Sequence, residues 1–269
     1  METSENINVS IIIPTWNRKN LLVECIEALI YQKEFDRSFE IIICDSNSTD
    51  GTEDRILEIK KNQKLDNLNL IHCTHNNVSS KRNAGIKLAK FNYIILLDDD
   101  CIVFNDYLKN FLEHFKVIND NEVLCGQYRT CEREITKSNY VRYRDSRNFT
   151  SSSFYFDKKD ELTFNRIVTG NLGFKKETII NKKIFFNEEI LGYGCEDVDW
   201  AHRLITSGFK IYKTEIKVFH KETSNSLSNY KMKWFYMANG SMPLLMKHNY
   251  SAASQLPMFF LEKQNKKAL

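Results

Sequence analysis

Two hydrophobic periods alternate along the first hundred residues, and this alternation limits the fold more than any other feature of the sequence. Three short runs are apolar and contain β-branched residues, Val9–Pro14, Phe39–Cys44 and Tyr93–Leu97, and Leu68–Cys73 is a further strand candidate. The segments between them carry apolar residues at helical spacing, as Leu22, Ile26 and Leu29 do. Apolar strands separated by helices of about 10–15 residues indicate βαβ units, whose crossovers cover both faces of a sheet. We therefore predict an α/β fold with a Rossmann-like, mostly parallel central sheet flanked by helices.

The second half of the chain is less regular. We expect strands at Val123–Tyr128, Arg166–Phe174, Phe209–Tyr212 and Glu215–His220, and a helix at Glu196–Thr206 that ends before Gly208. A polar and aromatic stretch, Asn139–Lys159, indicates a long surface excursion. After Asn225 the chain holds six lysines, one glutamate and several aromatic residues. The predicted organisation is one domain over residues 1–222 and a helical C-terminal extension over 223–269 that packs on or beside it.

Charge and cysteine usage exclude several classes of protein. Lys+Arg number 38 against 35 Asp+Glu, a net charge of +3, whereas nucleic-acid binders are usually strongly basic. The cysteines number seven, an odd count without a CxxC pair, which favours buried thiols in a reducing compartment over disulfides or zinc. The first residues do not resemble a signal peptide, and no apolar run approaches the roughly 18–20 residues that span a bilayer. The expected location is therefore the cytoplasm.

The strongest chemical signal is the triplet Asp98–Asp100, which directly follows the buried run Tyr93–Leu97. Adjacent carboxylates repel one another unless they are exposed or bind a hard cation. Alternate residues at the end of a strand point the same way, so one of Asp98 and Asp100 would bind Mn²⁺ or Mg²⁺ while the other contacts ribose or sugar hydroxyls. A solvated acidic turn is the alternative.

Other polar residues also follow predicted strands or begin helices. Asp45 follows the second strand, where a carboxylate can accept a hydrogen bond from a base or ribose, although its neighbours fit a turn with a helix cap. Lys81 and Arg82 begin a helix and could neutralise a pyrophosphate, or could simply be solvated.

Two acidic residues and a late histidine complete the candidates. Glu196 and Asp197 follow two glycines at a helix start, where a carboxylate could act as general base, although the helix dipole alone also favours acids there. His220 ends a strand and suits a mixed Asp/His/phosphate shell around Mn²⁺. A packed or solvated histidine is the alternative.

In their order and spacing, these residues resemble the inverting glycosyltransferases of family 2, which have the GT-A fold. The resemblance covers roughly residues 8 to 222. The motifs that carry it are IIIPTWNR (Ile11–Arg18), ICDSNSTDGT (Ile43–Thr52), SSKRNAGIKLA (Ser79–Ala89), YIILLDDD (Tyr93–Asp100), TGNLGFKK (Thr169–Lys176), GYGCEDVDWAHRL (Gly192–Leu204) and His220. Asn47, Lys81 and Cys195 depart from the family's usual residues, which affects the details of the substrate but not the class.

The resemblance implies a role for each matching residue. Asp197 would be the catalytic base and Glu196 would orient the acceptor. Asp100 and His220 would bind Mn²⁺ or Mg²⁺. The residues expected at the nucleotide sugar are Pro14, Thr15, Asn17, Arg18, Asp45, Arg82, Asp98, Asp99 and Asn171. UDP is the default nucleotide, and the acceptor is a glycan, a lipid-linked molecule or a protein that the sequence does not identify.

The expected reaction is a single in-line displacement that inverts the anomeric centre, in bacterial polysaccharide or glycoconjugate synthesis. The metal would offset charge on the diphosphate leaving group. A sugar nucleotidyltransferase is the runner-up, but it would normally need a Gly-rich basic loop where Pro14–Asn17 stands. A non-catalytic nucleotide-sugar-binding module is the third alternative.

The lysines and aromatic residues of the extension leave three roles open. They suit an interfacial helix on an anionic membrane, a lid over the acceptor cleft, or a contact in a homodimer. The first role would place the protein peripherally at the inner face of the plasma membrane.

Overall fold

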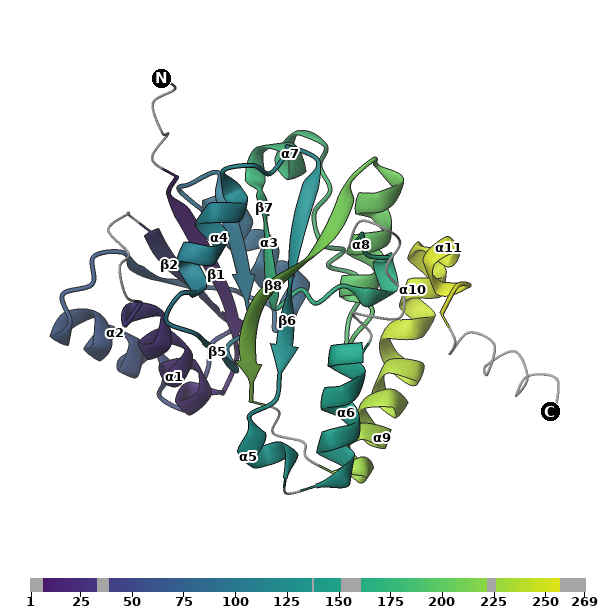
Figure 1. The fold of residues 1–269 in the computed structure, drawn as a ribbon, viewed down its shortest axis with the longest axis horizontal. Helices are drawn as coiled ribbons and strands as arrows, with labels where there is room; N and C mark the ends of the chain where they lie inside the picture. The colour runs from purple at the N-terminus through teal and green to yellow at the C-terminus, as the bar shows by residue number, and fades with distance from the viewer. Residues whose placement is uncertain (1–6, 33–38, 137, 151–160, 222–225, 257–269) are drawn as a thin grey trace.

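A computed structural model describes residues 7–32, 39–136, 138–150, 161–221 and 226–256, and its centre is one eight-stranded sheet (Figure 1). The strand order is β3-β2-β1-β4-β7-β6-β8-β5. The strands are β1 (Val9–Thr15), β2 (Phe39–Asp45), β3 (Leu68–His72), β4 (Tyr93–Leu97), β5 (Cys101–Val103), β6 (Glu122–Arg129), β7 (Asn171–Lys175) and β8 (Lys210–His220).

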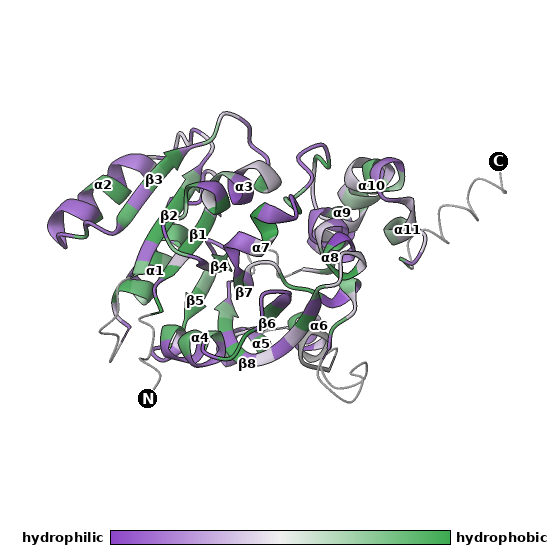
Figure 2. Ribbon diagram, turned by 90° about the horizontal axis from the view of Figure 1, so that it is seen from above, coloured by the Kyte–Doolittle hydropathy of each residue, from purple (hydrophilic) through white to green (hydrophobic). Residues whose placement is uncertain are grey.

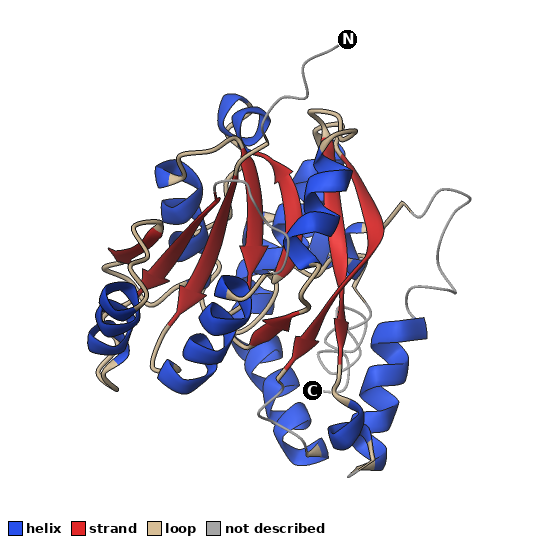
Figure 3. Ribbon diagram, turned by 60° about the vertical axis from the view of Figure 1, so that its left-hand side comes forward, coloured by secondary structure: helices blue, strands red, loops and turns tan. Residues whose placement is uncertain are grey.

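The first four strands pair in parallel, as the sequence predicts. β1 lies between β2 and β4, and β2 also pairs with β3. The other half of the sheet is mixed. β7 runs antiparallel to both β4 and β6, β6 and β8 are parallel, and β5 is antiparallel to β8. The sheet curls between helices on both sides (Figure 3). This arrangement confirms the predicted α/β fold.

Helices cover both faces of the sheet. They are α1 (Lys19–Ile30), α2 (Thr52–Asn62), α3 (Val78–Leu88), α4 (Tyr107–Phe115), α5 (Glu132–Ile135), α6 (Asn139–Thr150), η1 (Phe164–Arg166), α7 (Lys176–Asn181), α8 (Glu196–Thr206), α9 (Leu227–Tyr236), η2 (Met237–Ser241), α10 (Met242–His248) and α11 (Tyr250–Ala253).

Two hydrophobic clusters lie on opposite faces of the sheet. Successive side chains of a strand point to opposite faces, so Ile12 belongs to one cluster while Ile11 and Ile13 belong to the other. The cluster of Ile12 includes residues of α3 and α8, and the second includes residues of α1, α2 and α4. In Figure 2, β1 and β2 are mostly coloured hydrophobic, whereas α2 is mostly coloured hydrophilic.

The described part of the C-terminal extension is helical and packs against the α/β domain. Met242, Leu245 and Ala252 belong to the same cluster as Trp200 and Leu204 of α8. The boundary that we predict at residues 222/223 falls among residues outside the described part, so it stays a prediction. Among the described residues, the structure contains no helix that is long and apolar enough to span a membrane.

Two predictions about the second half were wrong in detail, and one segment has a conformation that the sequence analysis did not predict. Within the expected surface excursion Asn139–Lys159, residues 139–150 form the helix α6, and residues 151–160 lie outside the described part. α6 lacks an apolar stripe, so its sequence gives little periodic signal. The strand expected from Arg166 begins only at Asn171, after the turn η1. The two short strands expected at 209–220 are one strand, which pairs with β6 on both sides of a register shift between Cys125 and Gln127. At this shift Gln127 Nε2 donates to the Thr214 carbonyl (2.7 Å).

Gly85 lets α3 approach β1 closely, and we expect Gly85→Ala to destabilise the fold. A Cβ atom there would lie 2.3 Å from Ile12 Cγ2. Overpacking of this kind costs about 1–3 kcal/mol, which should lower the melting temperature by several degrees. Gly240→Ala is the matched control, because nothing lies within 4 Å of its added Cβ. Equal melting temperatures for the two variants would contradict this packing.

Candidate active site

Polar residues gather where β1, β2 and β4 end. Thr15 and Asp45 are register partners at the ends of β1 and β2, and the Asp98–Asp100 triplet follows β4 directly. The Thr15 hydroxyl donates to Asp99 Oδ2 at 2.8 Å. Carboxyl ends of parallel strands are where ligands bind in open α/β sheets, so this edge is the candidate site.

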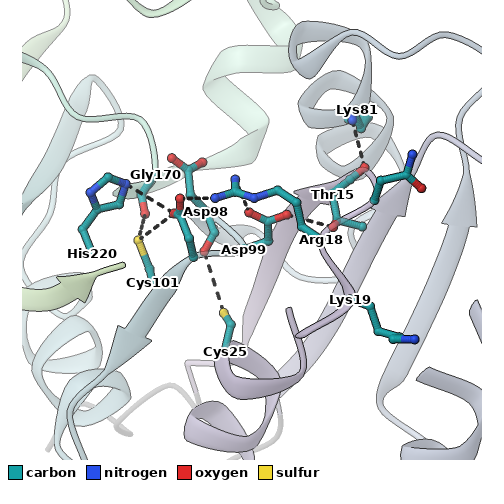
Figure 4. A network of polar contacts seen from close by, with 12 residues as sticks. Thr15, Arg18, Lys19, Cys25, Lys81, Asp98, Asp99, Cys101, Gly170 and His220 are labelled. Carbon is teal, nitrogen blue, oxygen red and sulfur yellow. Dashed lines mark hydrogen bonds and ion pairs between the residues drawn. The ribbon is translucent and has the colours of Figure 1, made fainter. Parts of the chain in front are cut away.

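The three aspartates contact different partners. Asp98 accepts hydrogen bonds from Arg82 (3.0 Å) and from the Tyr128 hydroxyl (2.8 Å). Asp99 pairs with Arg18 at 2.7 Å. Asp100 pairs with Arg18 and lies 3.4 Å from His220 Nε2. Figure 4 shows Arg18 and His220 approaching the triplet from opposite sides.

The expectation that Asp98 and Asp100 point the same way stays a prediction, although the two carboxylates pair with different arginines. It assumed that the extended backbone of β4 continues through the triplet. Instead the chain turns at once, and the Cys101 N–H donates to the Asp98 carbonyl at 3.1 Å. The turn separates the triplet into one carboxylate that faces Arg82 and two that face Arg18.

The two aspartates that face Arg18 are both buried but differ in their titration. Burial raises the pKa of Asp99 to about 7, although Arg18 opposes the shift. Burial also acts on Asp100, but the hydrogen bond and charge of His220, together with Arg18, outweigh it and lower the pKa of Asp100 to about 2. The His220 ring stacks on Tyr128, with centroids 4.4 Å apart. Asp100 is thus the carboxylate held in its charged form.

Arg82 connects the triplet to the start of α8. It is 3% exposed, and its guanidinium lies between Asp98 and Glu196, which is 3.2 Å away. The guanidinium also lies 5.4 Å from the centre of the Phe186 ring. The neighbouring Lys81 donates to the Thr15 carbonyl at 2.9 Å. Both cations of the α3 start therefore lie inside the site, not in solvent.

Asp197 lies one residue beyond Glu196 in the first turn of α8 and is half-buried. Burial and the adjacent charge of Glu196 raise the pKa of Asp197 to about 7, while Arg82 opposes the shift. A carboxyl group with this pKa can take up a proton near neutral pH, as a general base must.

Asp45 and Asn17 hold two loops together. Asp45 accepts hydrogen bonds from the Ser48 amide (2.9 Å) and from its hydroxyl. Asn17 accepts from the Thr49 amide at 2.7 Å. Pro14 pairs with Cys44 within the sheet. These contacts shape the site edge, and the predicted contacts of these residues with a nucleotide stay predictions.

Asn171 has a packing role in this structure. Its side chain is fully buried, accepts from the Tyr107 hydroxyl (3.0 Å) and donates to the Ile216 carbonyl (3.1 Å). Its predicted contact with the donor stays a prediction that would require rearrangement. Gly170 beside it leaves room for the site, because a Cβ there would lie 2.1 Å from Asp98 Oδ2.

Tyr128 is the site residue that the sequence analysis missed. It contacts both Asp98 and His220, but it lies 30 residues from Asp98 along the chain. It carries no motif of its own, since an aromatic residue in a strand is ordinarily a core residue. Only the pairing of β6 with β8, which sets Tyr128 opposite Val218, brings it to His220.

Comparison with known proteins identifies the family. The model of "Glycosyl transferase family 2" matches residues 10–179. A chondroitin synthase of Pasteurella multocida (strain Pm70) is 28% identical over 233 residues, which cover 76% of this chain but only 24% of that protein. A poly(ribitol-phosphate) beta-glucosyltransferase of Bacillus spizizenii is 29% identical over 153 residues, covering 56% of this chain and 24% of the relative. The chain thus spans about a quarter of the length of these two relatives.

Solved structures show the same architecture. S. aureus TarS (residues 1–349) gives a TM-score of 0.60 at 18% identity, covering 87% of this chain and 66% of that one. The mannosyltransferase PcManGT from Pyrobaculum calidifontis, solved with GDP-Man and Mn²⁺, gives 0.65 at 14% identity, covering 91% and 66%. Because the family model matches more than half of its length, the chain belongs to glycosyl transferase family 2, and its architecture is the GT-A fold.

Proposed function

We propose that this protein transfers a sugar from a nucleotide-diphosphate donor to an acceptor hydroxyl with inversion of the anomeric centre. The observation that carries the proposal is the bridge from Asp98 through Arg82 to Glu196. This bridge brings the aspartate triplet and the acidic start of α8 into one site, although they are far apart in the sequence. His220 joins the same site through Asp100.

Relatives and solved structures support the substrate class. A second poly(ribitol-phosphate) glycosyltransferase, TarP of Staphylococcus aureus, matches 45% of the chain at 30% identity, and S. aureus TarS has been solved with UDP and with UDP-GlcNAc. We infer from these names a UDP-sugar donor and an acceptor in bacterial polysaccharide or glycoconjugate synthesis. All seven cysteines are free thiols and six are buried, which supports a reducing, cytoplasmic location.

In the proposed mechanism, the Asp197 carboxylate accepts the proton of the acceptor hydroxyl. The hydroxyl oxygen then forms a bond to the anomeric carbon, and the bond from that carbon to the diphosphate oxygen breaks. The electron pair leaves with the nucleotide diphosphate. Glu196, held by Arg82, orients the acceptor, and the positive charges of Arg82 and Lys81 favour the anionic donor. Both reactants are thus held at the same edge of the sheet.

The donor set at Asp100 and His220 fits a divalent cation. A carboxylate and an imidazole suit Mn²⁺, and Mg²⁺ commonly uses one or two carboxylates with substrate phosphates. In the described part of the chain, no three His, Cys, Asp or Glu side chains are arranged to hold a metal, so phosphate oxygens and water would complete the shell. When bound, the cation would supply Lewis-acid stabilisation of the diphosphate leaving group.

Two alternatives can be separated from this proposal by their products. A sugar nucleotidyltransferase releases pyrophosphate, whereas a glycosyltransferase releases the nucleoside diphosphate. A non-catalytic nucleotide-sugar-binding module would bind the donor but release neither product. The sequence has Pro14–Asn17 at the end of β1 and no Gly-rich basic loop there, which favours transfer.

Replacing the proposed base should stop transfer without preventing donor binding. For Asp197→Asn we expect nucleotide affinity within about twofold of the original protein and a transfer rate lower by roughly 10²–10⁴, as for loss of a general base. Nucleotide release and a binding titration measure the two quantities. Asp54→Asn is the matched control, because Asp54 is an exposed acid in the first turn of another helix, α2.

The configuration of the product provides a check on the same displacement. The NMR coupling constant of its anomeric proton reports the configuration at that carbon. Retention of the donor's configuration would contradict the in-line displacement, and wild-type transfer by Asp197→Asn would contradict the base assignment.

The rate of transfer should rise with pH through about 7. The pKa of Asp197 is raised to about 7, first by burial and then by Glu196, and only the deprotonated carboxylate can accept a proton. We expect kcat to increase about tenfold per pH unit below this pKa and to level off above it. A kcat that is constant between pH 5.5 and 8 would contradict this assignment.

Arg18 should compete with a divalent cation for the aspartates, since its guanidinium pairs with both Asp99 and Asp100. We expect Arg18→Gln to bind Mn²⁺ more tightly than the original protein when nucleotide is absent, as measured by electron paramagnetic resonance of free Mn²⁺. Lys19→Gln is the control, because Lys19 contacts Asp50 and not the triplet. Unchanged or weaker Mn²⁺ binding by Arg18→Gln would contradict this competition.

A further inference from the structure

The loop that leads into α8 has an unusual backbone. Gly192, Gly194 and Cys195 all have positive φ angles, of 93°, 80° and 71°. Glycine adopts such angles readily, but for cysteine they are uncommon. A loop with two glycines has many alternative conformations, so contacts from outside must hold it in this one.

The segment η2 of the C-terminal extension supplies those contacts. Ser241 is fully buried, and its hydroxyl donates to the Tyr193 carbonyl at 2.7 Å. A Cβ added at Gly194 would lie 2.9 Å from Met237 Sδ, so η2 lies directly against the loop. η2 is a π-helical turn, a feature that often occurs at functional sites.

A second contact holds α8 itself. Asn249 Nδ2 donates to Asp199 Oδ1 at 3.0 Å, while Asn249 Oδ1 accepts from the Ala252 amide at the start of α11. Asp199 is 1% exposed and also pairs with Arg203. In Figure 1, α10 and α11 lie beside α8. The extension therefore contacts the first turn of α8 and the loop before it.

We propose that Ser241 is a positioning residue for Asp197, and that the extension acts through it and Asn249 as a brace for the start of α8. The brace selects the one loop conformation in which Asp197 meets the acceptor hydroxyl. This inference rests on the proposed function, because that function assigns the base role to Asp197. A displacement of about 1 Å at a reacting group can cost roughly 10²-fold in rate, so a modest shift of the loop would suffice.

The first experiment compares Ser241→Ala with Ser251→Ala in the full chain. We expect Ser241→Ala to lower kcat by roughly 10- to 100-fold while the donor KM and the UDP dissociation constant change by less than twofold. Ser251 is exposed on α11, so its variant should keep the original kcat. Circular dichroism at the assay temperature verifies that each variant is folded. An unchanged kcat for Ser241→Ala would overturn the proposal. So would a loss of donor affinity by the same factor as the loss of kcat.

Asn249→Asp provides a second variant in case Ser241→Ala does not fold. It keeps an oxygen to cap α11 but places a carboxylate against Asp199. We expect the same pattern, a lower kcat with unchanged donor binding. If this variant keeps the original kcat, the brace is not needed for transfer.

A double-mutant cycle tests whether Ser241 acts through Asp197. In the Asp197→Asn background, Ser241→Ala should cause no further loss, because the group that it positions is gone. If the residual rate instead falls by the same factor as in the original protein, the two residues act independently and the proposal is wrong. If Asp197→Asn alone keeps the full transfer rate, Asp197 is not the base and the proposed function is contradicted. If Asp197→Asn loses transfer but Ser241→Ala keeps the original kcat, only the brace is rejected.

Discussion

The site depends on one buried cation, the Arg82 guanidinium. A charge that is 3% exposed is tolerable only when it is paired, and Arg82 is paired on both sides, with Asp98 and with Glu196. These partners come from the end of β4 and the start of α8. α3 itself is fixed against β1, since Gly85 leaves no room for a side chain beside Ile12. Packing thus places the cation, and the cation brings together acids that lie far apart in the sequence.

The same constraint explains why neighbouring carboxylates differ in chemistry. Asp100 has His220 and Arg18 beside it and stays charged, with a pKa of about 2. Asp197 is buried next to Glu196, and its pKa rises to about 7. A site that must hold a diphosphate and also remove a proton needs both kinds of carboxylate. The positive charge of Arg18 offsets the negative charges of Asp99 and Asp100. A diphosphate that enters the site would be an alternative partner for the Arg18 guanidinium.

The sequence predicted those parts of the fold that depend on local patterns. The strands β1, β2 and β4 are buried on both faces, so their apolar runs were visible, and the residues at their ends were correctly placed at one edge. Tyr128 and Ser241 had no such signal, because each owes its position to contacts with distant segments. The different partners of Asp98 and Asp100 were not predicted, because a turn directly after β4 is not evident from three identical residues. α6 was missed because it lacks an apolar stripe.

The described part of the extension, residues 226–256, has two portions that the sequence alone did not separate. α10 and α11 are anchored, since Met242, Leu245 and Ala252 enter the cluster around Trp200. α9 has no buried residue and exposes Trp234, Phe235 and Tyr236. The anchored part contacts the Gly192–Cys195 loop, where the proposed brace would act, and a membrane anchor or a dimer contact alone would not require that contact. The three roles left open for the lysines and aromatic residues of the extension, at a membrane, over the acceptor or between protomers, stay predictions, and α9 offers exposed aromatic side chains for each of them.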